Sequence, residues 1–579
     1  MPPLRPVLAL KARCAQVLAS TLAAAFVRVA GGGICGAAKS LVGRPKKSGG
    51  SRKPVARVAE GILGSNPTAQ ILKVQQYVGQ GVPKDRRQEL LHQVLLLVTQ
   101  MMTQLNRKKK TKNSSFDLTV QKLGQALSYA LGTLLDSTVT KLDLRPLIHH
   151  TIKWVSTCKL NNRDPKETNA IDATKIENIL IKLFGENVRK LDSLVSIQWP
   201  HLVSGEVIKI IGSHCRNLRR LELACKCDAT AAMNDVKEDP AVARLERELM
   251  NSLGALYDRA PGDFSGTKPG GCPHLQALVL PRLDDEEGTL ASHVARALCS
   301  LRELEVISGA PMLVSLGMLK NQRHPPQKLN LKHLSDIDTY NRRPMPDLTY
   351  LTKLLPHLSN IELIVSQTIT KAVTENFLSV KSLKIAQADF HLSVRRFKYL
   401  ETLDINLEFQ VAWPLLFTLS RGRVQIKDLT LRHSTFQVAQ EYEGSLKFPT
   451  LKSFTLVRSS FIEYNAFKNL VMGAPNLVNL FVTLSDDRNY MVDEFRDDLI
   501  MSVAPLLSNL ESFTAECQYK HNLYNQLNCI LTIDSVNVLC ANCPFLKFLG
   551  HLDVWDLDDK DVNELNDRVR VNNWDLQVV

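Results

Sequence analysis

Pairs of cysteine and histidine are the residues of this chain whose spacing could hold a metal ion or support redox chemistry. Cys540-Ala-Asn-Cys543 is a C-x-x-C pair, Cys225-Lys-Cys227 is a closer pair, and His149-His150 is a third. A structural zinc site needs four ligands, and no second pair stands at a suitable spacing beside any of these. We therefore expect cysteines that are buried for packing, and neither a metal nor a redox centre.

Two further segments match binding loops only in part. In Gly31–Ser40 two alanines separate the last glycine from Lys39, whereas a phosphate loop needs lysine directly after the glycine. The acidic run Asp553–Asp567 lacks the central glycine and the ligand spacing of a calcium-binding loop, so it predicts a solvated cap. The patterns H-E-x-x-H and G-x-S-x-G do not occur. We expect no enzymatic activity, no cofactor and no small-molecule substrate.

The composition is that of a folded protein whose positive charge is concentrated at its amino-terminal end. Of 579 residues, 44% are apolar and 22% are charged, which supplies enough apolar side chains for a large core. The net charge is +14, but residues 151–579 hold 49 basic and 52 acidic side chains. Because the main body is close to neutral, the charge balance argues against nucleic acid as a partner.

Residues 1–59 form a basic leader without an acidic residue. They contain six Arg, five Lys and twelve Ala, and the first carboxylate is Glu60. Three interpretations stay open: a mitochondrial presequence, a secretory signal interrupted by basic residues, and a disordered tail. The apolar segment Cys14–Val27 is short of the roughly 20 apolar residues of a membrane span. We expect no membrane span and an intracellular location, in the cytoplasm or nucleus, with the mitochondrion as the alternative.

Residues 60–138 are predicted to form a small helical region. Apolar residues recur at helical spacing within residues 66–105 and again within residues 115–138. The basic cluster Arg107–Lys112 between them is either a nuclear import or phosphate-contacting sequence, or a solvated loop. One face of the first helix holds Leu90, Leu91, Val94 and Leu95.

From about residue 139 the chain repeats one pattern, which is its most specific feature. The unit is an apolar residue, two variable residues, a second apolar residue, one variable residue and a third apolar residue, as in Leu400-Glu-Thr-Leu403-Asp-Ile405. From Leu275 onward the first positions of successive units lie 20 to 36 residues apart. Units begin at Val139, Leu218, Leu275, Leu301, Leu358, Val380, Leu400, Ile426, Leu451, Leu477 and Leu510, with degenerate units at Val188, Leu331 and Leu546.

The pattern predicts alternating strands and helices. The apolar-x-apolar core indicates a short strand, and the segments between the units indicate helices that return the chain to the next strand. No single unit can bury its own apolar face, so the units must stack and form a parallel sheet. Returning helices are predicted at Gly205–Cys215, Glu287–Ser300, Asp347–Leu358, Thr370–Val380, Tyr464–Met472, Arg496–Leu507 and Ile533–Ala541.

These units resemble the leucine-rich repeat superfamily, in particular the long, cysteine-containing type of F-box/leucine-rich-repeat and ribonuclease-inhibitor-like proteins. Cys215-Arg-Asn-Leu218, Cys272-Pro-His-Leu275 and Cys543-Pro-Phe-Leu546 place cysteine three residues before the first leucine, as that type does. The resemblance covers about residues 139–555 and implies an α/β fold. That fold would be a right-handed solenoid, a horseshoe with parallel strands inside and helices outside. It hosts many unrelated roles and so implies no single function.

The chain departs from the family pattern in two places. Residues 226–271, with the charged helical stretch Pro240–Tyr257, are an insertion or a distorted repeat, and residues 556–579 are predicted to be an acidic carboxy-terminal cap. The asparagine expected three residues after the last strand leucine is replaced by a serine, whose hydroxyl can also satisfy turn backbone. These serines are Ser366, Ser434, Ser459 and Ser485.

The concave inner face of the strands is the predicted binding surface. The middle residue of each strand would project from it, and acids in the early strands give way to uncharged residues later. That order suits a partner with a basic end and a neutral end. The candidate partner-binding residues are Glu222, Glu305, Glu362, Lys384, Asp404, Thr430, Thr455 and Phe481.

We expect a non-catalytic scaffold that displays this rigid surface to a protein partner. The resemblance offers an alternative, a substrate receptor of a cullin-RING ubiquitin ligase with a divergent F-box. Gln88–Leu97 is similar to the opening helix of an F-box, but the second half is replaced by the polar loop at Arg107–Lys112. A mitochondrial assembly factor, suggested by the leader, is a second alternative. The helix that would dock the ligase adaptor carries Leu90, Leu91, Val94 and Leu95.

Overall fold

The computed structural model describes the repeat region and part of the sequence before it. The described ranges, apart from isolated positions within them, are 82–108, 139–144, 188–199, 205–223, 240–257, 271–281, 288–320, 325–336, 348–363, 376–385, 397–436, 445–484, 495–517 and 529–578, with scattered residues between 18 and 135. Almost all of the leader 1–59 and most of the loops of the insertion 226–271 lie outside the described residues.

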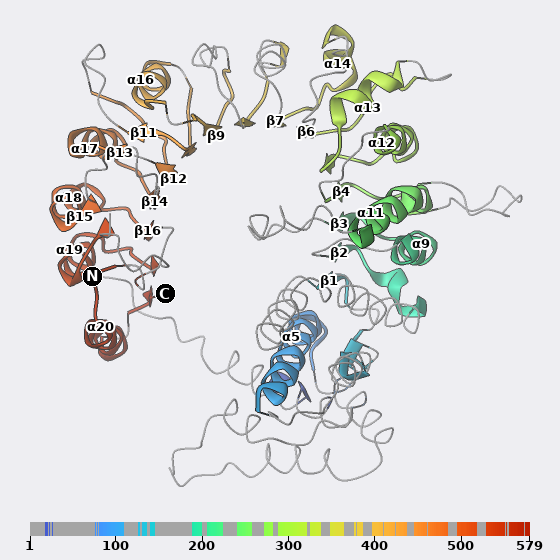
Figure 1. The fold of residues 1–579 in the computed structure, drawn as a ribbon, viewed down its shortest axis with the longest axis horizontal. Helices are drawn as coiled ribbons and strands as arrows, with labels where there is room; N and C mark the ends of the chain where they lie inside the picture. Colours follow the sequence, from blue (N-terminus) through green and yellow to red (C-terminus); the bar gives the residue numbers. More distant parts are fainter. Residues whose placement is uncertain are drawn as a thin grey trace, which may run out of the picture. The chain divides into compact units, whose positions relative to one another are not determined.

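Fifteen parallel strands form one open sheet, and their order in the sheet follows the chain (Figure 1). The strands are β1 (Lys141–Asp143), β2 (Ser196–Gln198), β3 (Arg220–Glu222), β4 (Ala277–Val279), β5 (Val306–Ser308), β6 (His333–Asp336), β7 (Asn360–Leu363), β8 (Ser382–Ile385), β9 (Thr402–Asn406), β10 (Asp428–Arg432), β12 (Ser453–Ser459), β14 (Asn479–Leu484), β16 (Ser512–Cys517), β18 (Phe548–Gly550) and β19 (Gln577–Val578). Two small pairs join β11 (Thr435–Phe436) to β13 (Phe461–Ile462), and β15 (Phe495–Arg496) to β17 (Cys529–Ile530).

The chain divides into two compact units, each with its own part of the sheet. Residues 8–311 and 318–330 form the first unit, with β1 to β5, and residues 312–317 and 331–579 belong to the second, with β6 to β19. The helices are α5 (Lys84–Lys108), α9 (Gly205–His214), α11 (Pro240–Ser252), α12 (Thr289–Ser300), α13 (Met312–Leu319), α14 (Leu348–Leu354), α16 (Trp413–Arg421), α17 (Tyr464–Gly473), α18 (Asp497–Val503), α19 (Ile533–Asn542) and α20 (Asp559–Val571), with 3-10 helices at Val188–Ser193, Leu253–Leu256 and Ala504–Leu506.

Six of the predicted returning helices are confirmed: α9, α12, α14, α17, α18 and α19. The predicted helix at Thr370–Val380 lies mostly outside the described residues. Two helices, α13 and α16, were missed. The apolar residues of α13 run almost without interruption and leave little helical periodicity, whereas α16 buries Trp413, Leu416 and Leu419 at helical spacing, so its signal was present in the sequence. Pro414 stands in the first turn of α16, where a missing N–H costs nothing. None of the described helices has the length and apolar character that crossing a bilayer requires.

Alternation along each strand gives the sheet two different faces. In β9, Leu403 and Ile405 are fully buried, whereas Thr402, Asp404 and Asn406 are half-buried. The buried residues face the side covered by the returning helices, which lie along one side of the strands in Figure 1. The other face, which we call the open face, carries the polar residues of the strands.

The pairing of β4 with β5 shows that one repeat unit begins at a later residue than the sequence predicted. Val279 pairs with Ser308 and Leu278 with Ile307, so the unit starts at Leu304, three residues later than the predicted Leu301. The reason is Gly309, which takes the third apolar position and hides the pattern. Its φ of 80° is left-handed, and a Cβ there would lie 2.0 Å from the carbonyl oxygen of Leu280.

A second repeat unit also begins at a later residue than predicted. The degenerate unit assigned to Val188 begins instead at Leu194, because Ile197 pairs with Leu142 on one side and with Leu221 on the other. The residues from Val188 to Ser193 form a 3-10 helix that precedes this strand.

An asparagine directly before the first leucine of a unit ties its turn to the preceding turn. In four units the Nδ2 group donates a hydrogen bond of 2.8 to 3.0 Å to a backbone carbonyl one unit back. These contacts hold the turns in step with the strands. The pairs are Asn217 to Asp192, Asn330 to Arg302, Asn476 to Pro449 and Asn509 to Pro475.

Two of the predicted serines form a buried pair past the ends of β10 and β12. The left-handed residues His433 and Arg458, with φ of 46° and 53°, turn the chain immediately before them. The hydroxyls of Ser434 and Ser459 are then 3.0 Å apart, and both side chains are fully buried. The serine hydroxyls were predicted to bind turn backbone, but these two hydroxyls hydrogen-bond to each other. Ser366 and Ser485 lie outside the described residues.

The helical segment of the insertion packs on α9 through glycine. The predicted helix Pro240–Tyr257 is confirmed as α11 followed by a 3-10 turn, with Leu249, Leu253 and Leu256 buried. A Cβ on Gly212 of α9 would lie 2.1 Å from the carbonyl oxygen of Ala255, so only glycine permits this approach.

The sheet continues beyond residue 555 into the predicted cap. Asp558 and Asp561 form a reciprocal capping box at the start of α20. After that helix, β19 pairs with β18 through Gln577 and Val578. The carboxy-terminal segment therefore contributes the last strand of the sheet.

Side chains of α5 bind the free edge of β1. Gln88 Oε1 accepts hydrogen bonds from the backbone N–H groups of Thr140 (3.1 Å) and Lys141 (2.9 Å), and its Nε2 donates to the Lys141 carbonyl. One turn later, His92 Nε2 accepts from the N–H of Asp143 at 3.1 Å. The two side chains thus take the place of a neighbouring strand.

We expect Gln88→Ala to destabilise the first unit, because two edge N–H groups lose their partner. The cost should be about 1–3 kcal/mol. Hydrogen exchange measured by mass spectrometry should speed up in the peptide that contains Lys141. The matched control is Glu89→Ala on the same helix turn, whose exposed pair with Arg86 should contribute little. Unchanged exchange in Gln88→Ala would contradict this assignment.

A double-mutant cycle tests the serine pair. Ser434→Ala and Ser459→Ala should each destabilise the protein, by about 1–3 kcal/mol, because the remaining buried hydroxyl loses its partner. The double variant should cost less than the sum of the two, since no hydroxyl is then left unsatisfied. Denaturant unfolding of the four proteins measures the coupling, and strictly additive losses would show that the hydroxyls do not interact.

Candidate functional site

The register of the second unit brings the middle residues of nine strands into one line across the open face, which we call the central row. Each residue pairs with the corresponding residue of the next strand, as Lys384 does with Asp404 and Thr430 with Thr455. In chain order the central row is Ser335, Glu362, Lys384, Asp404, Thr430, Thr455, Phe481, Thr514 and Gly550. Six of the eight predicted binding residues belong to this row.

At the first end of the central row, charged residues bind one another. Lys384 Nζ donates to Glu362 Oε1 at 2.6 Å, and His333 Nε2 stands 4.0 Å from Glu362 Oε2. The side chains of Glu362 and His333 are each 23% exposed, so the group is partly shielded from water. The carboxylate of Glu362 is therefore already neutralised within the protein.

The next acid in the row is held more firmly. Arg432 lies one strand further and two residues along, and its Nε and Nη2 donate to the two carboxylate oxygens of Asp404 at 2.7 and 2.9 Å. This two-point geometry is the strongest form of arginine–carboxylate contact. The Asp404 side chain is 17% exposed. Arg432 was missed in the sequence because it follows the last strand leucine, outside the middle column.

The second end of the central row has no charge. Thr430, Thr455 and Phe481 are half-buried and pair directly from strand to strand, while Thr514 is buried. A threonine offers both a donor and an acceptor, and the ring of Phe481 offers apolar area beside them. This stretch can therefore form hydrogen bonds and apolar contacts with a partner.

Glu222 stands apart from these residues, in the first unit. It pairs in register with Gln198 and Val279, but its side chain is only 1% exposed. Its Oε2 accepts from Gln198 Nε2 at 3.0 Å and from Arg220 Nη2 at 3.2 Å. The predicted contact with a partner is therefore corrected, because this carboxylate is buried by its own chain.

Glu305 is displaced from the predicted column by the frame of its unit. Ser308 occupies the position beside Val279, and Glu305 precedes β5. Its N–H donates to the carbonyl of Gln276, in the turn before the strand. The predicted place of Glu305 in the strand column was wrong, because the unit begins at Leu304 and not at Leu301.

The predicted adaptor-docking residues lie in the core of the first unit. Leu90, Leu91, Val94 and Leu95 are all buried. They belong to α5, whose Gln88 binds the edge of β1. Adaptor docking through these side chains would require them to become exposed.

Three cysteines that stand three residues before an apolar repeat position, and the nearby Cys540, are buried thiols. Burial raises the pKa of Cys272 and of Cys543 to about 12, and it raises the pKa of Cys215 further. Burial also raises the pKa of Cys540. These thiols stay protonated at neutral pH and are weak nucleophiles. Cys225, Cys227 and the pair His149-His150 lie outside the described residues, among which no group of His, Cys, Asp and Glu is arranged to hold a metal ion.

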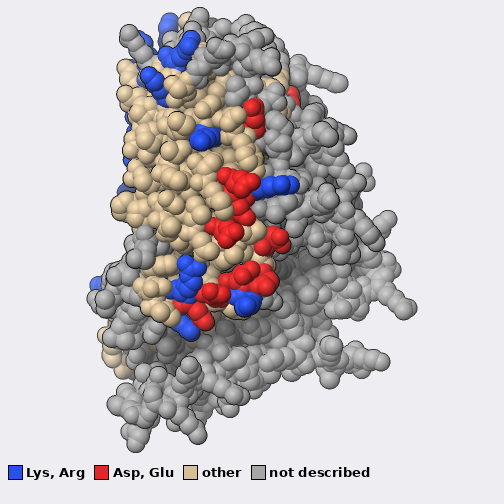
Figure 2. Space-filling view, turned by 90° about the vertical axis from the view of Figure 1, so that its left-hand side faces the viewer, with Lys and Arg blue, Asp and Glu red and all other residues tan. Residues whose placement is uncertain are grey.

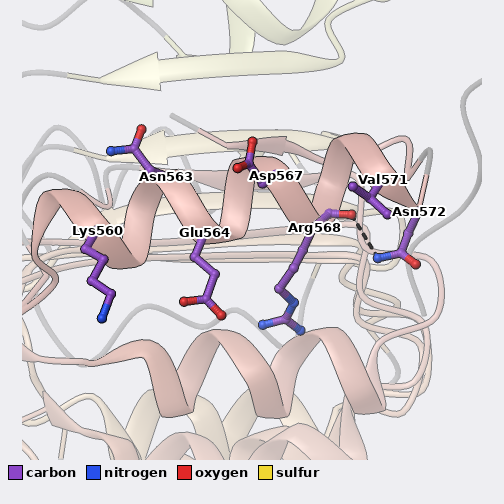
Figure 3. Close-up of a pocket in the computed structure, with 7 residues that line it drawn as sticks. All are labelled: Lys560, Asn563, Glu564, Asp567, Arg568, Val571 and Asn572. Atoms are coloured by element: carbon purple, nitrogen blue, oxygen red, sulfur yellow. Dashed lines mark hydrogen bonds between the residues drawn. The ribbon is translucent and has the colours of Figure 1, made fainter.

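A hollow of about 690 Å³ lies along α20 (Figure 3). Lys560, Glu564 and Arg568 point to one side of this helix, and Asn563 and Asp567 point to the other. Its lining residues all come from the one helix and the residue after it. Arg568 Nη1 already donates to Asn537 Oδ1 of α19 at 2.7 Å. The hollow therefore lacks the converging groups of a catalytic or ligand site.

Comparison with models of known protein families gives no match, and no curated protein matches the chain significantly. The central row is accordingly the candidate site on its geometry alone.

Acidification should weaken the second unit through His333. Burial lowers the pKa of this imidazole from its ordinary 6.5, Glu362 acts to raise it, and Lys384 acts to lower it. As the pH falls, the unfolded chain takes up the proton first. The contribution of His333 to the free energy of unfolding is therefore fully present above pH 6.5 and is lost as the pH falls below that value. Unfolding free energies from about pH 7.5 to about pH 5 should fall less in His333→Gln than in the natural protein.

The matched control for this prediction is His357→Gln, an exposed histidine of the same unit. Its pH dependence should follow that of the natural protein. If His333→Gln and His357→Gln give the same slope, the burial of His333 has no effect on stability.

Proposed function

We propose that the chain is a right-handed leucine-rich-repeat solenoid, with its strands inside a horseshoe, that acts as a non-catalytic protein-interaction scaffold. The parallel sheet in chain order and the repeated strand–helix unit support this assignment. Repeats of this kind provide extended rigid surfaces, which a partner can bind without much loss of conformational entropy on the scaffold side.

The observation that carries the proposal is the unbroken register of the central row over nine strands. Its side chains are fixed by backbone pairing from Ser335 to Gly550, and its neutral stretch from Thr430 to Phe481 is half-exposed. Such a row presents polar and apolar groups at the regular spacing of about 4.8 Å between strands. A folded protein surface or an extended segment can match that spacing.

The internal ion pairs change the partner that we infer. The sequence suggested a basic end on the partner, but Glu362 and Asp404 are already bound by Lys384 and Arg432. Replacing these contacts would leave the two cations without their carboxylates, which is costly where they are partly buried. We therefore place the main contact on Thr430, Thr455 and Phe481, and assign the charged end a role in holding the strands in place.

Charge insertion in the neutral stretch tests this surface. Thr455→Arg and Phe481→Arg should each reduce the recovery of specific partners at least about tenfold, since a buried apolar anchor and its polar neighbour are lost. The measurement is quantitative mass spectrometry after affinity purification of tagged protein from its own cells.

The matched control is Lys468→Glu, an exposed charge reversal on α17. It should keep all partners, and thermal unfolding of each variant confirms that the fold is retained. Partners that survive both arginine substitutions in folded protein would place the binding surface elsewhere.

A further inference from the structure

Lysine predominates at the position directly before the strands of the second unit. At this position each backbone carbonyl accepts hydrogen bonds from the next unit, so the residues form a continuous line from Lys332 to Lys547. We call this line the turn edge. Its nine residues are Lys332, Ser359, Lys381, Glu401, Lys427, Lys452, Val478, Glu511 and Lys547.

Both acids of the turn edge are bound by lysines of the same edge. Lys427 Nζ donates to Glu401 Oε2 and Lys547 Nζ donates to Glu511 Oε2, each at 2.8 Å. Three further lysines therefore leave the turn edge with an excess of positive charge. Lys452 is exposed, and its side chain makes no hydrogen bond or ion pair with the described residues.

Acidic side chains of the second unit gather elsewhere. Asp497 and Asp498 lie in the first turn of α18, Asp534 in that of α19, and Asp558 and Asp561 form the cap of α20. Figure 2 shows Asp and Glu in a band that runs down the face on which these helices lie. This placement follows the helix dipole, which favours negative charge at the amino-terminal end of a helix. These acids belong to the helices and not to the turn edge.

A groove of about 500 Å³ lies on the turn edge beside Lys452. Val478 and Pro449 provide apolar surface, and the ring of Phe545, 52% exposed, stands at one end. Lys427 and Lys452 stand at the other end, with Glu511 between, bound to Lys547. We call this hollow the turn groove.

The turn groove is built on fixed backbone. Asn476 and Asn509, which line it, donate to the carbonyls of Pro449 and Pro475. The Thr450 hydroxyl also donates to the carbonyl of Ile426 at 2.9 Å. A ligand would therefore find the groove already formed, which lowers the entropy cost of binding.

We propose that the turn groove binds an extended acidic segment of a partner protein, with a carboxylate on Lys452 and an apolar side chain against Phe545 and Val478. Strands are about 4.8 Å apart, so the three steps from β12 to β18 span about 14 Å, which an extended chain covers in about four residues. The segment therefore has an acid and an apolar residue about four residues apart.

Charge and apolar area together favour a peptide over a nucleic acid. Affinity for a phosphate backbone grows with the number of cations that contact it, and Glu401 and Glu511 each neutralise a lysine of the turn edge. An exposed phenylalanine at one end of the groove and a lysine at the other suit a segment that carries both an apolar and an acidic residue. This site is separate from the central row, so it can fail while the scaffold proposal stands.

Fluorescence anisotropy with a labelled peptide tests the site on the full chain. The probe carries two adjacent glutamates and, about four residues later, a leucine, in a serine and glycine background. Lys452→Glu should weaken binding about tenfold and reduce its dependence on salt. Phe545→Ser should weaken it by a similar factor, and a probe with leucine changed to serine should bind the natural protein as weakly.

Two variants serve as controls. Lys468→Glu, an exposed charge reversal on α17 outside the groove, should bind as the natural protein does. Lys452→Arg keeps the charge and should retain binding, and unchanged thermal unfolding shows that each variant is folded.

Three results would overturn the proposal. Equal affinity of Lys452→Glu and the natural protein would show that the peptide binds elsewhere or not at all. Affinity that depends on Lys452 but is unchanged by Phe545→Ser or by loss of the leucine would indicate general attraction of polyanions. Self-association of the natural protein that is abolished by Lys452→Glu would identify a second copy of the chain as the occupant.

Discussion

Register between neighbouring strands is the constraint on which this structure depends. The strands of the main sheet are two to seven residues long, too short to be stable alone, and each is positioned by hydrogen bonds to the strands beside it. Buried apolar residues of the strands, such as Leu403 and Ile405 in β9, fix which side chains face the core. A slip of one residue would exchange the two faces, so the same constraint places every residue of the open face.

The consequence for binding is that charge on the open face is organised within the protein. Asp404 and Arg432 come from neighbouring strands, as do Glu362 and Lys384. Each ion pair therefore links two neighbouring repeats of the sheet. The neutral stretch lies where such pairing ends, and in the turn groove Lys452 lies between residues that are paired in this way. The surface available to partners thus depends on which charged side chains already form ion pairs within the protein, as well as on which residues are exposed.

Most of the fold follows from the sequence, because strand alternation and helical spacing are local signals. The frame at Leu301 could not be found in this way, since Leu301, Leu304, Val306 and Ile307 fit two alignments and only strand pairing selects one. The burial of Glu222 and the partner of Asp404 depend on neighbours that are distant in sequence. The asparagine directly before the first leucine of a unit is visible in the sequence, as in Cys215-Arg-Asn-Leu218. Its hydrogen-bond acceptor could not be predicted, because the acceptor lies in the turn of the preceding repeat.

The capping of β1 by α5 also determines how the molecule can associate. An open parallel sheet ends in a strand whose N–H and C=O groups can pair with a strand of another molecule, and repeated pairing of that kind produces filaments. Gln88 and His92 occupy those groups from within the chain. While the helix stays in place, a strand of another molecule would have to displace these two side chains before it could pair with β1, which disfavours association at this edge of the sheet.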